Sequence, residues 1–165
     1  MYKIKLLISL LISLVLLSCT NINAPKNNAK FYLGYIGGEF DALLLYNFMD
    51  AHLRSYNMLD INSKFEIRSS IEHSTGVYVT NIDNTSDREA ITSELVLEIY
   101  DKKLNCTVYE YNNKINQFYI YASGEKFISN TTALKKIKSE NTEELVKGFI
   151  NTLIYENIEC AAKKK

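Results

Sequence analysis

Residues 91–101, ITSELVLEIYD, carry the alternating pattern that decides the fold. One side of this segment is formed by Ile91, Leu95, Leu97 and Ile99, and the other by Thr92, Glu94, Glu98 and Tyr100. Val96 is the exception. Because successive side chains of a strand point to opposite faces, the segment predicts a strand with one buried and one solvated face. Residues 101–103 then turn the chain.

Three further segments predict strands around it. Residues 31–36 form a short aromatic run that Gly37 and Gly38 close with a tight turn. Apolar and polar residues alternate from Phe65, and Ser74–Gly76 is expected to interrupt that strand before 77–79 resume it. The stretch 106–121 is also strand-like, with a bulge or an end expected at 112–114 and a break at Ser123–Gly124. A polar loop is expected over Asn81–Asp87.

Two segments show the helical period. Ala42–Tyr56 places apolar residues at i, i+3 and i+4, and Asp41 is expected to cap this helix. The second helix is expected over Thr131–Asn157. Asn141 followed by Glu144 resembles a capping box, which predicts two helical pieces with a kink near Ser139.

The element order β-α-β-β-β-α predicts an α+β fold. Strands in succession favour an antiparallel or mixed sheet of about four strands, with the two helices packed on one face. We expect a single domain over 31–160 and a charged tail over 161–165.

Residues 1–18 have the pattern of a secretion signal and not of a folded domain. Lys3 and Lys5 precede an uncharged run over Leu6–Leu17, and Ser18-Cys19 follows. The run of 12 residues spans about 18 Å as a helix, which is short of the roughly 30 Å hydrocarbon core, so cleavage is favoured over a permanent span. We expect a signal peptide over 1–18 and a polar stalk over 19–30.

This leader resembles the bacterial lipoprotein signal, which is cut between Ser18 and Cys19. The resemblance implies that Cys19 is diacylated on sulfur and acylated on its amine, which tethers the protein to a membrane. Lipoproteins retained in the inner membrane typically have Asp directly after the lipidated cysteine. This chain has Thr20 there, so the resemblance implies the outer membrane. An ordinary secretory signal with an incidental cysteine is the alternative.

The charge balance argues against nucleic acid as a partner. The full chain has 19 Lys and Arg against 19 Asp and Glu. Without Lys3 and Lys5 the count becomes 17 against 19, so the chain from Cys19 is slightly acidic. Nucleic-acid binding rests on a basic surface, which this balance does not provide.

The residues give no case for an enzyme. His52 and His73 have no metal-ligand spacing to Cys, Asp or Glu, and no nucleophile elbow or phosphate-binding loop occurs. We therefore expect no catalytic residues, no metal and no cofactor.

Two cysteines and three cations remain as candidates. Cys106 begins a strand and Cys160 follows the second helix, so an antiparallel packing of the two would let them form a disulfide, with isolated buried thiols as the alternative. Arg88, Lys102 and Lys103 lie at strand ends, where loops could contact an anionic head group. Ordinary solvated loop charges are the alternative.

Beyond Cys19, five segments follow one another in an order that resembles that of the lipopolysaccharide-assembly lipoprotein family LptE, in particular its divergent alphaproteobacterial members. These segments are FEIRSSIEH, DNTSDREAI, SELVLEIYD, NQFYIYAS and EELVKGFINTL. The resemblance implies that the protein plugs the lumen of an LptD-like outer-membrane β-barrel. As a plug it would also aid assembly of the barrel and bind lipopolysaccharide. It would face the periplasm or the barrel lumen. An auxiliary lipoprotein of an ABC-type phospholipid transporter and a surface lipoprotein without a transport role are the alternatives.

Overall fold

The computed structural model describes residues 28–79, 87–120, 127–156, 158 and 160. Its elements, in chain order, are β1 (Phe31–Gly37), α2 (Glu39–Ser55), β2 (Phe65–Val79), β3 (Asp87–Asp101), β4 (Cys106–Ile120) and α3 (Phe127–Leu153). The signal peptide, most of the stalk and the charged tail lie outside the described residues. So do most of the expected loop Asn81–Asp87 and the break at Ser123–Gly124.

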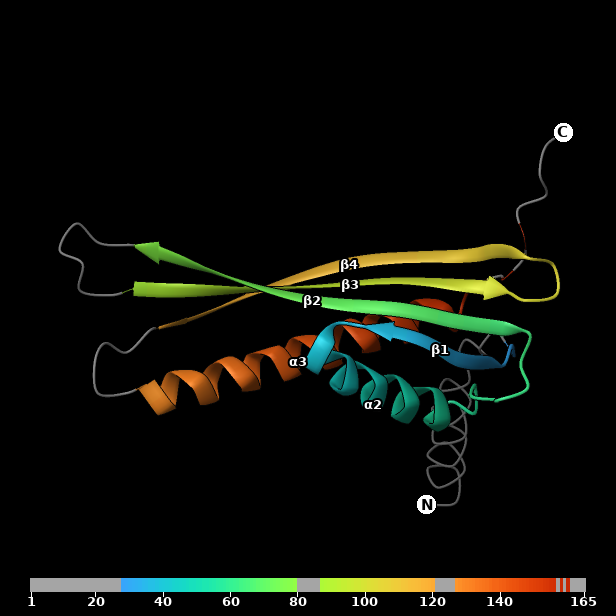
Figure 1. Cartoon of the computed structure of the whole chain (residues 1–165), viewed down its shortest axis with the longest axis horizontal. Coiled ribbons are helices and arrows are strands. Elements are labelled where there is room, and N and C mark those ends of the chain that lie inside the picture. The colour runs from blue at the N-terminus through green and yellow to red at the C-terminus, as the bar shows by residue number, and fades with distance from the viewer. Residues whose placement is uncertain (1–27, 80–86, 121–126, 157, 159, 161–165) are drawn as a thin grey trace, which may run out of the picture.

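The strands form one mixed sheet in the order β1-β2-β3-β4. β1 runs parallel to β2, whereas the β2–β3 and β3–β4 pairs are antiparallel. Both helices lie on the same side of this long sheet (Figure 1). The predicted α+β fold is therefore confirmed.

The molecule has two distinct ends. At one end β1, β2 and β4 begin and β3, α2 and α3 end; we call it the base, formed by residues 28–31, 55–65, 101–106 and 153–160 as far as these are described. At the other end β2 and β4 end and β3 and α3 begin; we call it the tip. β3 has 15 residues and is therefore about 50 Å long.

The alternation read from the sequence defines the core. Ile67 pairs with Ile99, and Ile71 pairs with Leu95, with all four side chains buried beneath the helices. The helices contribute the buried residues Leu45, Met49, Leu53, Leu145, Phe149 and Leu153. Val96, the exception in the pattern, points to the opposite, open face and is exposed.

Two expected strand interruptions are wrong. Ser74–Gly76 does not break β2, because each residue of β2 from Phe65 to Val79 pairs with a residue of β3. Continuous pairing with a long neighbour outweighs the weak strand preference of Ser and Gly. β4 likewise passes through 112–114 without a break, and its register instead shifts opposite Ile99 and Tyr100.

Both helices begin earlier than expected. Gly38, with φ at +126°, precedes α2, and Asp41 lies inside the first turn rather than capping it. α3 is a single helix of 27 residues, so the expected division near Ser139 is wrong. The reason is that Asn141 is buried and donates to Ser93 on β3, so the polar residue marks a contact with the sheet and not a helix start.

No helix among the residues that the structure describes combines the length and apolarity needed to cross a bilayer.

Replacing Gly38 by alanine is expected to destabilise the fold. A Cβ at this position would lie 2.7 Å from the Ile71 carbonyl oxygen, and the positive φ disfavours any L side chain. We expect the free energy of unfolding to fall by about 1–3 kcal/mol, measured by urea denaturation. Asn47→Ala, at an exposed position of the same helix, should change it by less than about 0.5 kcal/mol. Equal stability of the two variants would contradict the assigned backbone conformation.

Candidate functional site

Hydrogen bonds and a disulfide hold the segments of the base together. The Phe31 amide donates to the Met58 carbonyl at 2.7 Å, which joins the start of β1 to the chain after α2. Cys106 and Cys160 form a disulfide with their Cα atoms 6.3 Å apart, which joins β4 to the segment after α3. The chain preceding residue 28 therefore enters the domain at its most cross-linked end.

A buried carboxylate organises the turn between β3 and β4. One oxygen of Asp101 accepts from the amides of Lys103 at 2.8 Å and Leu104 at 3.0 Å, and the other lies 3.1 Å from the Lys64 Nζ. Burial alone would raise the pKa of Asp101, but these hydrogen bonds and the Lys64 charge outweigh it and lower that pKa. The turn thus presents Lys102, Lys103 and Leu104 in one defined conformation.

The three candidate cations do not form one site. Lys102 and Lys103 follow β3 at the base, whereas Arg88 is the second residue of β3 at the tip. Arg88 and Lys102 are 14 positions apart along an extended chain, or roughly 45 Å. A single head group cannot contact both ends.

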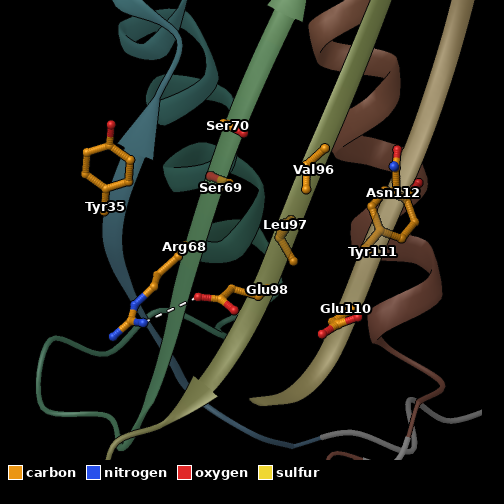
Figure 2. A pocket seen from close by; sticks show the side chains of 10 residues that line it. All are labelled: Tyr35, Arg68, Ser69, Ser70, Val96, Leu97, Glu98, Glu110, Tyr111 and Asn112. Atoms are coloured by element: carbon orange, nitrogen blue, oxygen red, sulfur yellow. Dashed lines mark hydrogen bonds and ion pairs between the residues drawn. The ribbon is translucent and has the colours of Figure 1, made fainter. Parts of the chain in front are cut away.

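The open face of the sheet carries a groove of about 570 Å³. Tyr35, Arg68, Val96, Glu98 and Asn112 are among its lining residues, and Figure 2 shows them distributed over all four strands. Arg68 makes ion pairs with Glu66 at 3.1 Å and Glu98 at 3.4 Å, and its guanidinium lies over the Tyr100 ring. Hydrogen bonding to Glu66 is the main cause that raises the Arg68 pKa.

The charge of the open face is mainly acidic. Among the side chains that the structure describes, alternation along the strands places on it the carboxylates Glu66, Glu72, Glu94, Glu98 and Glu110 against the cations Arg68 and Lys114. This distribution does not favour broad capture of an anionic lipid by the sheet.

An apolar surface that the sequence analysis missed lies on the outside of α2. Phe40 is 95% exposed and Leu43 is 67% exposed, and Tyr46 follows them one turn later. A groove between α2 and β1 is lined in part by Tyr32, Tyr46 and Ile61. The available signal was that residues 40–49 are apolar on more than one side of the helix, beyond the one side that the core requires.

A buried polar cluster links the sheet to both helices. The His73 Nδ1 lies 2.7 Å from the Ser93 Oγ, which also accepts from the Asn141 amide at 2.9 Å. On the other side of the ring, Nε2 lies 3.5 Å from the Thr142 Oγ1 and 3.9 Å from Asp41, which pairs with Lys138 at 3.2 Å. Because the Thr142 hydroxyl donates to the Lys138 carbonyl, the contacts favour a proton on Nε2 and a Ser93 hydroxyl that donates to Nδ1.

This cluster has the residue types of a catalytic triad but not its access. The Ser93 side chain is fully buried, and the sheet and α3 cover it, so no substrate can reach its oxygen. We interpret the cluster as a structural contact between sheet and helices. No group of three or more potential metal ligands occurs among the described residues, and neither His52 nor His73 lies in one.

Comparison with known proteins establishes the fold and leaves the family open. No protein-family model and no curated protein matches the sequence. A minor lipoprotein from Acinetobacter baumannii has a similar structure, with a TM-score of 0.61 at 13% identity, over 83% of this chain and 98% of that one. The rare lipoprotein B from Shewanella oneidensis gives 0.51 at 8% identity, over 73% and 95%. Solved structures with this fold thus include bacterial lipoproteins.

Acid is expected to destabilise the domain through His73. Burial, together with Lys138, lowers the pKa of this histidine below 6.5 despite the nearby Asp41. The unfolded chain therefore binds the proton first, so stability is full above about pH 6.5 and falls as the pH drops below it. Urea titrations between pH 7.5 and 5 should show this decline. His73→Gln should be less stable at pH 7.5 by about 1–3 kcal/mol yet show a shallower decline. His52→Gln, the control, should retain the wild-type slope; an unchanged slope in His73→Gln would contradict the assignment.

Loss of the disulfide is expected to cost substantial stability. The bond joins residues 54 positions apart, and the chain-entropy model assigns about 4 kcal/mol to a loop of this size. Cys160→Ser should lower the free energy of unfolding by roughly that amount, and Cys106→Ser combined with it should cost no more. Thiol titration of the denatured, unreduced protein with lipidated Cys19 should find no free thiol. Two free thiols would contradict the pairing.

Proposed function

We propose that this chain is a non-enzymatic outer-membrane lipoprotein that plugs a lipopolysaccharide-inserting β-barrel and assists lipopolysaccharide transport to the cell surface. Lipid on Cys19 would hold it at the membrane, with the domain facing the periplasm or lying within the barrel lumen. The observation that carries the proposal is the elongated domain whose N-terminal chain enters at one end.

The dimensions suit such a plug. β3 is about 50 Å long, whereas the apolar band of an outer-membrane barrel is about 25 Å tall. A domain held at its base by a short tether can therefore reach through the thickness of the membrane with its tip. α2 covers the sheet only from the base to about Ile71, which leaves a narrow tip formed by β2, β3, β4 and the start of α3.

The two kinds of surface suit the two environments of a barrel partner. Barrel lumens are polar, which matches the charged open face of the sheet. The apolar flank formed by Phe40, Leu43 and Tyr46 is suited to a specific protein contact. Arg88 at the tip is the candidate for a lipopolysaccharide phosphate, because it lies at the end away from the tether.

Photo-crosslinking in the native outer membrane tests the proposal. A photoreactive amino acid is placed at Val96 on the open face and at Leu43 on the flank, both exposed. We expect both positions to capture the same β-barrel, several times larger than this chain, and depletion of the lipoprotein to reduce surface lipopolysaccharide. Lys136, exposed on the outer side of α3, is the matched control and should capture less.

Two outcomes would contradict the proposal. Capture of a phospholipid-transporter component at both positions would favour the auxiliary transport lipoprotein. Unchanged surface lipopolysaccharide after depletion, together with protease access to the domain on intact cells, would favour a surface lipoprotein without a transport role.

A further inference from the structure

We infer that the base of the domain binds the phospholipid bilayer surface directly, in addition to the lipid on Cys19. This inference rests on the membrane anchor of the proposed function but not on the barrel. It assigns the bilayer contact to side chains at three places in the base: the α2–β2 loop, the β3–β4 turn and the segment after α3.

Exposed apolar side chains gather at this end. Ile61 is 77% exposed in the α2–β2 loop, Leu104 is 64% exposed in the β3–β4 turn, and Tyr155 is 52% exposed after α3. They come from three separate connections, and Ile61 also lines the edge of the groove between α2 and β1. Single apolar and tyrosine side chains beside lysines are typical of residues that enter the interfacial layer of a membrane.

The β3–β4 turn has a defined conformation in which Lys102, Lys103 and Leu104 are exposed. Asp101 accepts from the amides of Lys103 and Leu104, and the Lys102 amide donates to the Lys64 carbonyl at 2.9 Å. Asn105 has a positive φ of 55°, which completes the tight turn. Because these bonds already fix the turn, insertion of Leu104 costs little additional ordering.

The distribution of charge agrees with the same orientation. Lys102 and Lys103 are exposed and make no ion pair with any residue that the structure describes, although the Lys102 Nζ lies 4.8 Å from the centre of the Tyr32 ring; Lys64 is paired with Asp101. Among the described residues of the base, Lys30, Lys64, Lys102 and Lys103 exceed Asp60, Asp101 and Glu156 by one charge, so the net positive charge is small. The open face is acidic by contrast, so an anionic phospholipid surface attracts the base and repels the sheet.

The length of the stalk brings the base to the membrane. Asn28, the first described residue, lies nine positions after Cys19, and this length of chain can span about 30 Å at most. A tether of this length maintains a high local concentration of the base at the bilayer, so even weak contacts are populated. Ile61, Leu104 and Tyr155, together with Tyr56, are exposed at the base and within its reach, whereas Phe40 lies farther along the molecule, at the start of α2.

Lipid photo-crosslinking tests the inference on the full, lipidated chain. The protein is purified from membranes and reconstituted into vesicles of phosphatidylethanolamine and phosphatidylglycerol that contain a phospholipid with a diazirine near its glycerol. We expect adducts, mapped by mass spectrometry, at Ile61, residues 102–104 and Tyr155. Phe40, more exposed than any of these but distant from the base, is the internal control and should carry few.

Paired variants separate apolar from charge contributions. Leu104→Asp with Ile61→Asp should lower adducts at the base by roughly tenfold, since a buried apolar side chain contributes that much or more to partition. Phe40→Asp should leave the base adducts unchanged. Lys102→Ala with Lys103→Ala should make the yield of base adducts independent of the phosphatidylglycerol content of the vesicles. All these positions are exposed, and an unchanged melting temperature verifies that each variant folds.

An even spread of adducts over the base and Phe40 would overturn the inference, because it would mean that the domain swings freely on its tether. The vesicles contain no barrel, so the result is independent of the plug role. If adducts form at the base but no barrel is captured in cells, the bilayer contact holds and the plug role is rejected. If a barrel is captured but the adducts are evenly spread, the plug role holds and the bilayer contact is rejected.

Discussion

Parallel pairing of β1 with β2 determines where the chain enters the domain. Phe31 lies beside Phe65, so the start of the first strand shares an end of the sheet with the start of the second. A parallel pair requires a crossover, and α2 supplies it by returning along the buried face to the same end. The antiparallel turns and the disulfide then complete the base. An antiparallel β1 at the same place would have started beside Ser70, near the middle of β2 and away from the base.

The two ends differ in how they are held. The base combines a buried carboxylate, a disulfide and chain-to-chain hydrogen bonds. Between base and tip, the core changes from apolar residues to the polar cluster around His73, where Asn141 and Thr142 meet the sheet. Beyond this cluster α2 no longer covers the strands, so stability should decrease toward the tip. A rigid base and a less supported tip suit a protein that is anchored at one end and works at the other.

Local sequence patterns predicted which segments form strands and helices, but not where each of them begins and ends. The alternation through Ile91–Ile99 reflects one buried face, and in the structure Ile91, Leu95, Leu97 and Ile99 are all buried on that face. Ser74–Gly76 misled because strand continuity depends on pairing with β3, which no local segment encodes. Asn141 misled because a buried amide and a helix cap have the same residue type, and only the distant Ser93 distinguishes them. Lys102 and Arg88 looked equivalent as strand-end cations, but only strand length shows that they lie at opposite ends.

The account depends on the orientation of an elongated domain standing on its base. Neutron reflectometry of the lipidated protein on a supported phosphatidylethanolamine and phosphatidylglycerol bilayer measures this orientation directly. We expect protein density to extend about 50 Å from the head groups, the length of β3, with density at the head groups from the base. A layer only as thick as one sheet and one helix, with the domain lying flat, would contradict the account.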